Sequence, residues 1–141
     1  MSMVDEVLIS KAESIERCLQ RIEEDYIGFE EEIETNFTRR DAIILNLQRA
    51  CETSIDAALR IVRLYKLGSP ESGRDAFDLL EKNNVIPREL CEKLKKMVGF
   101  RNIAVHDYQK INADILKAIL NNSLPDFKVF SSILIKLEVI K

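Results

Sequence analysis

The chain has 141 residues, of which 46% are hydrophobic and 32% charged, and its net charge is −3. This length and this hydrophobic content suit one domain, residues 1–141, with a buried core. No apolar run approaches the roughly 20 residues that cross a bilayer, and the N-terminus lacks the basic and apolar regions of a secretory signal, so we expect a cytoplasmic protein without a membrane segment. Cys18, Cys51 and Cys91 lie far apart and there is one histidine, which indicates reduced thiols, no zinc site and no cofactor.

Apolar residues at helical spacing predict three helices in the first half of the chain. In residues 4–26, apolar side chains recur every three or four positions, and Gly28 breaks this helix. A short helix over residues 29–36 follows. Thr38, with Asp41 three residues later, resembles a helix N-cap signal. It would open the longest helix, over residues 39–66, whose core stripe is Ile44, Leu47, Cys51, Ile55, Ala58 and Val62.

Glycine, proline and asparagine divide the second half of the chain into shorter helices. Residues 68–70 end the long helix, and the next helix is expected over residues 72–82. Asn112 resembles the N-cap of a helix that reaches residue 120, and Pro125 starts the last helix. Pro87 suits the first turn of the helix that carries Leu90, Leu94, Met97 and Val98. Since no alternating strand pattern occurs, the sequence predicts an all-α antiparallel bundle of five to six helices.

The last predicted helix is apolar over more than one face. A small monomer has difficulty burying so many apolar side chains, which favours a two-fold symmetric dimer. The same residues can also serve the core of a single chain. They are Phe127, Val129, Phe130, Ile133, Leu134, Ile135, Leu137, Val139 and Ile140.

The charges are distributed unevenly along the chain. Residues 1–36 contain 11 acidic and 3 basic side chains, whereas residues 37–141 contain 13 acidic and 18 basic ones. An acidic arm beside a mildly basic body suits an anionic ligand on one face. Solvated helix faces give the same pattern, so charge alone leaves both interpretations open.

The segment MVGFRNIAVHDY, residues 97–108, brings several polar side chains together at the end of an apolar helix. At about 100° per residue, Arg101 and Tyr108 lie about 20° apart on an unbroken helix, and His106 lies about 140° from Arg101. The three side chains therefore converge only if the helix ends or loosens between residues 104 and 107.

These groups suit one kind of chemistry. Imidazole, with a typical pKa of about 6.5, takes and returns protons at cellular pH. Guanidinium holds a phosphate and stabilises a charged transition state, and a phenol can orient the phosphate or donate a proton. Together they suit metal-free RNA cleavage, in which the 2′-OH attacks the adjacent phosphate. The simpler alternative is that His106 caps a helix C-terminus and Arg101 pairs with an acidic neighbour.

A polar stripe runs along the longest predicted helix. Arg49, Glu52, Thr53 and Asp56 occupy positions i, i+3, i+4 and i+7 of that helix. Such a stripe is usually solvated. In the alternative arrangement it faces the segment around Arg101, and its carboxylates orient the arginine or the histidine.

The segment RNIAVHDY, which has the form Arg-x4-His-x-Tyr, resembles the signature of the HepT toxins. These form a branch of the HEPN superfamily of small helical ribonucleases. The similarity also covers DAIILNLQRACETSIDAALRIV, SPESGRDAFDLLEKNNVIP and LKKMVGFRNIAVHDY, which follow the order and spacing of the family. It runs over residues 41–130, and the N-terminal helix is compatible with it.

The resemblance implies an HEPN-like homodimer in which two signature segments meet in a shared cleft. It implies that Arg101 and His106 are catalytic, with Asn102 as the polar residue beside the arginine, and Glu52 and Asp56 of the stripe are candidate supporting residues. The implied partners are an RNA substrate and an antitoxin of the MntA nucleotidyltransferase type. That antitoxin can attach AMP from ATP to the signature tyrosine, here Tyr108, and the added charge and bulk would block an anionic RNA.

We therefore predict the toxin of a type II toxin–antitoxin system, a metal-independent endoribonuclease that leaves a 2′,3′-cyclic phosphate. An alternative is a non-catalytic helical subunit that binds nucleotide or substrate for a nucleotidyltransferase partner. Such a subunit needs no histidine for proton transfer. A purely structural dimerisation module leaves the signature unexplained.

Overall fold

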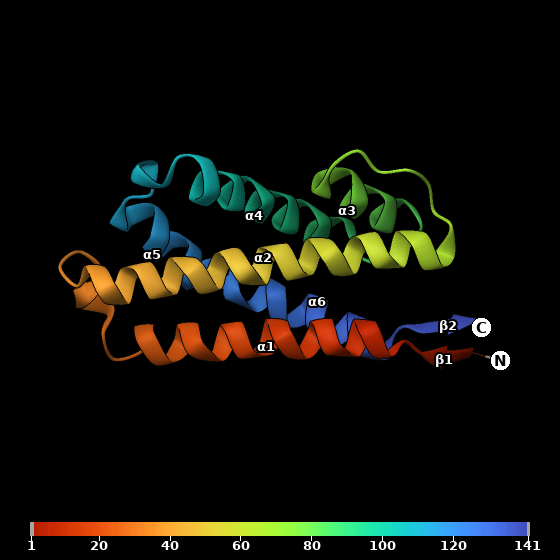
Figure 1. Ribbon diagram of the computed structural model, residues 1–141, viewed down its shortest axis with the longest axis horizontal. Helices are drawn as coiled ribbons and strands as arrows, with labels where there is room; N and C mark the ends of the chain where they lie inside the picture. The colour runs from red at the N-terminus through yellow and green to blue at the C-terminus, as the bar shows by residue number, and fades with distance from the viewer. Residues whose placement is uncertain (1, 141) are drawn as a thin grey trace.

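The computed structural model describes residues 2–140, and this part of the chain contains six α-helices, two short 3-10 helices and one pair of strands (Figure 1). The order of elements confirms the predicted all-α bundle. None of the described helices is long and apolar enough to span a membrane. The elements are β1 (Ser2–Val4), α1 (Glu6–Tyr26), η1 (Glu30–Ile33), α2 (Phe37–Tyr65), α3 (Gly73–Lys82), α4 (Arg88–His106), η2 (Tyr108–Lys110), α5 (Ala113–Asn122), α6 (Leu124–Lys136) and β2 (Glu138–Ile140).

The long helix α2 forms the middle of the bundle. It packs against α1 on one side and against α3 and α4 on the other, as Figure 1 shows. Helix α6 lies against α1 and also contacts α2 and α4, which closes the core. Phe77 of α3 and Phe130 of α6 meet edge to face there, with ring centroids 5.7 Å apart. Because α2 contacts both layers, its side chains reach α1 on one face and α4 on another.

A buried carboxylate fixes α1 against α2. Asp5 is fully buried and caps α1, since its side chain accepts a hydrogen bond from the Leu8 N–H at 3.0 Å. It also pairs with Arg60 of α2, which donates to the two carboxylate oxygens at 3.1 and 2.9 Å. The two-point contact with a guanidinium offsets the desolvation of the buried charge and sets the register of the two helices.

The start of α2 differs from the prediction. Asn36, not Thr38, is the N-cap, because its side-chain oxygen accepts from the Arg39 N–H at 3.1 Å, and the helix begins at Phe37. The predicted helix over residues 29–36 shrinks to the 3-10 helix η1, in which Ile33 is the one buried residue. Three consecutive glutamates there supply no apolar face for a longer helix to bury. The predicted N-cap at Asn112 is confirmed, with a hydrogen bond of 2.8 Å from the Ile115 N–H.

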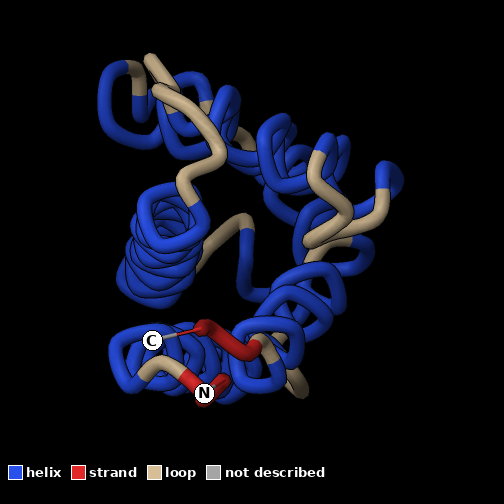
Figure 2. Tube along the Cα trace, turned by 90° about the vertical axis from the view of Figure 1, so that its right-hand side faces the viewer, coloured by secondary structure: helices blue, strands red, loops and turns tan. Residues whose placement is uncertain are grey.

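The two ends of the chain form a short antiparallel sheet, which the sequence did not predict. Met3 of β1 lies opposite Val139 of β2, so both termini are at the same end of the bundle (Figure 2). The last helix was expected to continue to Ile140, but α6 ends at Lys136. Pairing with β1 satisfies backbone groups that a frayed helix end would leave open, and the β-branched residues of both segments favour extended backbone.

The apolar residues of the last helix mostly serve the core of this chain. Phe127, Phe130 and Leu134 are fully buried, whereas Val129 and Ile135 remain 49% and 45% exposed. This outcome matches the interpretation in which α6 belongs to the core, while Val129 and Ile135 keep apolar surface outside it.

Candidate active site

Helix α4 and the turn after it carry the Arg-x4-His-x-Tyr segment. The helix runs without a break to His106 and ends at Asp107, whose N–H still donates to the Ile103 carbonyl at 2.8 Å. The end falls within the predicted interval. Arg101 and His106 nevertheless stay on one regular helix, about 140° apart around its axis and about 7.5 Å apart along it. Only Tyr108, in η2, is redirected by the end of the helix, so the three side chains do not converge within one chain.

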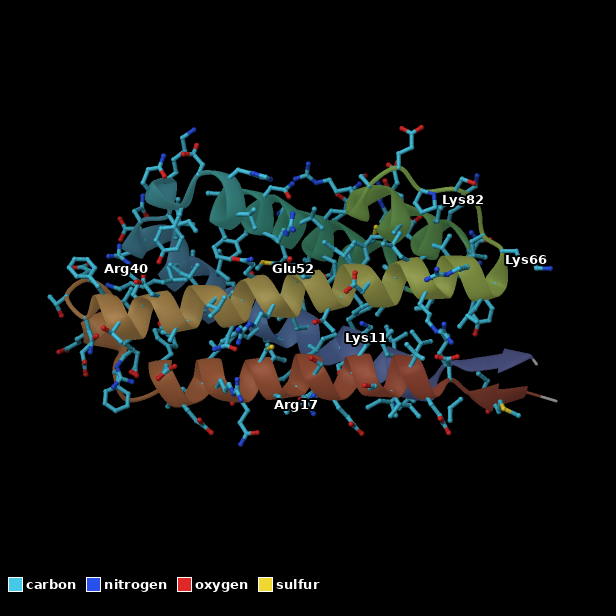
Figure 3. The ribbon with its side chains drawn as sticks, in the orientation of Figure 1. Lys11, Arg17, Arg40, Glu52, Lys66 and Lys82 are labelled. Carbon is cyan, nitrogen blue, oxygen red and sulfur yellow. The ribbon has the colours of Figure 1, made fainter. Side chains whose placement is uncertain are left out.

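A carboxylate on α2 holds the arginine. Arg101 Nη2 lies 3.1 Å from Glu52 Oε2, and the Asn102 side-chain oxygen accepts from Arg101 Nη1 at 3.4 Å. Figure 3 labels Glu52 in the middle of α2, on the side that faces α4. Glu52 thus orients Arg101, as one of the two predicted arrangements of the polar stripe requires.

Arg101 keeps donor capacity after this contact. Among the residues that the structure describes, its buried Nε has no hydrogen-bond partner, and 29% of its side chain is exposed. A guanidinium has five N–H groups, and Glu52 uses a small part of them. The simple ion pair considered from the sequence is therefore present, and it leaves the arginine able to bind a phosphate.

The contact between α2 and α4 is fixed next to this ion pair. The Cys51 thiol of α2 donates to the Met97 carbonyl of α4 at 3.5 Å. Met97 lies one helical turn before Arg101. Burial raises the pKa of the Cys51 thiol well above its ordinary value, so this cysteine stays protonated and serves the packing of the helices. Cys18 and Cys91 form no disulfide, as predicted, and both are buried.

A cleft of about 380 Å³ opens beside Arg101, between α2, the first turn of α3 and α4. Asp56 lies on its wall, but its carboxylate is 3.9 Å from Lys11 of α1 and does not contact Arg101 in the described structure. Arg74 on α3 adds a cation that the sequence gave no reason to single out. Both basic and acidic side chains line the cleft: Glu52, Asp56, Ser72, Arg74, Arg101 and Asn102.

A second carboxylate on α2 holds the tyrosine. The Tyr108 hydroxyl donates a hydrogen bond to Asp41, while 42% of the residue remains exposed. Partial burial raises the pKa of Tyr108 to about 12, and the hydrogen bond to Asp41 adds to the shift, which Arg40 opposes. Figure 3 labels Arg40 near the start of α2.

The partner of Tyr108 was missed from the sequence, where Asp41 was interpreted only as part of a helix cap. The helical periodicity of α2 nevertheless indicated that Asp41 lies on the same side as Glu52. Asp41 precedes Glu52 by eleven residues, so both lie within about 20° on one side of α2 and about 16.5 Å apart. A helix that runs antiparallel along this side contacts both carboxylates, and α4 with η2 does so.

Two exposed apolar side chains lie between the two polar contacts. Leu45 follows Asp41 by one turn on α2, and Val105 follows Arg101 by one turn on α4. They are 42% and 41% exposed. The side of α2 and α4 that carries the site thus has an apolar centre with a polar contact at each end.

His106 is the last residue of α4 and is exposed. In the described part of the chain, the His106 side chain makes no hydrogen bond and no ion pair with another residue. An unoccupied, accessible imidazole is free to take or give a proton, provided that a phosphate is brought to it. The alternative in which His106 caps the end of α4 has no His106 side-chain hydrogen bond to support it in the described structure, where the backbone N–H of Asp107 makes the cap contact.

Comparison with known families gives one match that covers most of the chain. Residues 15–134 match the family described as Ribonuclease HepT-like. The mRNA nuclease HepT of Shewanella oneidensis is 46% identical over 131 residues, which are 93% of this chain and 98% of that protein.

Solved structures agree with the sequence comparison. The tri-AMPylated Shewanella oneidensis HEPN toxin, in complex with the MNT antitoxin, superposes with a TM-score of 0.88 at 46% identity, over 93% of this chain and 98% of that one. A toxin–antitoxin structure with AMP-PNP has a TM-score of 0.87 at 45% identity, over 92% of this chain and 98% of that one. The helical bundle and its order of elements are therefore those of the HEPN toxins.

Proposed function

Because the chain belongs to the HepT-like ribonuclease family, we propose that it is the toxin of a type II toxin–antitoxin system, an endoribonuclease that a nucleotidyltransferase antitoxin silences. The observation that carries the proposal is the Arg-x4-His-x-Tyr segment at the end of α4 and the start of η2, with Arg101 oriented by Glu52 and His106 accessible. A non-catalytic binding subunit has no use for an accessible imidazole five residues after an oriented guanidinium.

The proposed chemistry is an attack of the RNA 2′-OH on the adjacent phosphorus. The new bond joins the 2′-oxygen to phosphorus, the bond to the 5′-oxygen breaks, and a 2′,3′-cyclic phosphate and a 5′-OH result. Arg101 binds the phosphate oxygens and stabilises the charge that builds up on them. The imidazole of His106 transfers a proton. Since the nucleophile belongs to the substrate and a guanidinium supplies the positive charge, these steps run without a metal ion.

The chemistry also favours a homodimer. Cleavage needs a base for the 2′-OH and an acid for the departing 5′-oxygen, and each chain has one histidine. Two copies supply two imidazoles. Leu45 and Val105, exposed between the contacts of Arg101 and Tyr108, give a two-fold interface an apolar centre next to both signature segments.

Light scattering is expected to give a mass about twice the 16.2 kDa of one chain. Leu45→Glu or Val105→Glu should produce monomers, because a carboxylate buried at such an interface has no partner. Val129→Glu, at a residue of similar exposure on α6, is the matched control and should stay dimeric. A wild-type chain that is monomeric at micromolar concentration contradicts the shared cleft.

Control by an antitoxin is proposed to act on Tyr108. Its hydroxyl lies on a half-exposed side chain next to the catalytic segment. The relatives in complex with an antitoxin include a tri-AMPylated toxin. One or more AMP groups on this phenol would place negative charge where the RNA phosphates bind and would repel them.

The function is tested by incubating the purified chain with RNA in EDTA. Cleavage that persists in EDTA and leaves 2′,3′-cyclic phosphate ends, seen by mass spectrometry of the products, is expected. Prior incubation with the antitoxin, ATP and Mg²⁺ should abolish it. A chain that binds RNA or nucleotide without cleaving either supports the non-catalytic alternative instead.

A further inference from the structure

The contact between Tyr108 and Asp41 has a chemical consequence for the modification reaction. Two segments that are far apart in the sequence meet here, since Asp41 belongs to the first turns of α2 and Tyr108 to η2. The phenol donates its proton directly to the carboxylate. A donor and an acceptor already in contact need no rearrangement for the proton to pass between them.

A phenol needs such an acceptor when it acts as a nucleophile. Attack through oxygen on phosphorus releases the phenolic proton, and the pKa of Tyr108 is raised to about 12. At neutral pH nearly all of the phenol is then protonated. Transfer through free phenolate alone is correspondingly slow, whereas a base in contact removes the proton while the new bond forms.

We propose that Asp41 is the general base for the first AMP transfer, accepting the proton of the Tyr108 hydroxyl as its oxygen attacks the α-phosphorus of ATP held by the antitoxin. The bond from the phenolic oxygen to phosphorus forms, the bond from the α-phosphorus to the bridging oxygen breaks, and pyrophosphate leaves. The proton passes to the Asp41 carboxylate and then to solvent. This inference rests on the proposed function, and it assigns part of the transfer machinery to the toxin itself.

The neighbouring charged groups are not placed to accept the proton of the Tyr108 hydroxyl. On α2, Arg40 is a cation and accepts no proton. On the segment of Tyr108 itself, the Asp107 carboxylate pairs with Lys110 at 2.7 Å and accepts a hydrogen bond from Gln109. Among the described residues, Asp41 alone accepts a hydrogen bond from the Tyr108 hydroxyl.

The opposite role for Asp41 makes an opposite prediction. A carboxylate that merely holds the phenol, and so restrains it, must release it before transfer. Removing that restraint would accelerate the modification. If Asp41 is instead the base, its removal slows the modification. The sign of the change in rate therefore separates the two roles.

The experiment measures the rate of the first AMP addition, by intact-mass spectrometry, for the full chain with its antitoxin and Mg-ATP between pH 6 and 9. Asp41→Asn keeps the shape and the hydrogen bond but accepts no proton, so the rate at neutral pH should fall about 100-fold. It should then rise about tenfold per pH unit, as the free phenolate does. The wild-type rate should change little over this range, because a carboxylate is ordinarily ionised above pH 6. Asp41→Glu should restore much of the rate and this weak dependence on pH.

Asp114→Asn, at an exposed aspartate in the first turn of α5, is the matched control for the lost charge and should behave as wild type. Thermal unfolding by circular dichroism checks that each variant is folded. An unchanged or faster transfer to Asp41→Asn overturns the inference and leaves the proposed function intact. Failure of the wild-type chain to accept AMP overturns the proposed control by modification.

Discussion

His106→Ala is expected to lower RNA cleavage by a factor of at least about 100, the usual contribution of a positioned general acid or base. The chain has one histidine, so no other imidazole can replace it. The side chain is exposed at the end of α4 and supports no packing, so the fold should be unaffected. Initial rates on a defined RNA measure the effect, and thermal unfolding checks the fold.

Arg101→Ala should cause a loss of similar size for a different reason. The guanidinium stabilises charge on the phosphate, and loss of one such electrostatic contact typically costs a factor of about 100 to 1,000 in the rate. Arg101→Lys keeps the charge without the planar fork and should recover only part of the activity. Lys96→Ala removes a cation from an exposed position on the same helix and should change the rate little. Substantial cleavage by purified His106→Ala would rule out the proton-transfer role.

Each variant also tests how the two chains of a dimer share the site. Arg101 and His106 lie on different sides of α4 and do not converge within one chain. If an arginine of one copy acts with a single histidine of the other, then a mixture of the two inactive variants should recover part of the activity through mixed dimers; if both imidazoles of a dimer are needed, the mixture should stay inactive. Variants of this kind fail to complement each other if each chain acts alone.

The sequence predicted the parts of the fold that repeat. Helices α1, α2, α4 and α6 each have an apolar stripe over at least three turns, and such stripes identify both the helix and its buried face. Caps were less predictable, because Asn36 and Thr38 are both good N-cap residues and lie two positions apart. The pair β1 and β2 joins the two ends of the chain, and three residues per strand are too few for a visible alternation.

The sequence indicated the residues of the candidate site more readily than their contacts. The segment from Arg101 to Tyr108 was evident, and the polar stripe pointed to Glu52, which does contact Arg101. Whether Asp56 would do the same depended on which of two stripe residues faced Arg101, and the Asp56 carboxylate lies 3.9 Å from Lys11 of α1 instead. Asp41 was missed because its contact depends on where the chain turns after α4, which no local pattern reports.

Tyr108→Phe is expected to accept no AMP from the antitoxin, because the attacking oxygen is absent while the ring is kept. Tyr65→Phe is the matched control, since it removes a hydroxyl that donates to the Glu138 carbonyl far from the signature, and it should be modified like wild type. Intact-mass spectrometry after incubation with antitoxin, ATP and Mg²⁺ reads the result in increments of one AMP residue. An adduct on Tyr108→Phe means that another residue is the acceptor.

The nuclease activity of the same variant then shows what else the phenol does. If Tyr108→Phe cleaves RNA as fast as wild type, the hydroxyl serves control alone, and cells that carry the variant should remain poisoned in the presence of an antitoxin that acts by modification. If cleavage is lost, the phenol also positions the phosphate, and the antitoxin blocks the reaction by modifying a group that the reaction needs. In both cases the fold should hold, because Tyr108 is half-exposed and packs into no core position.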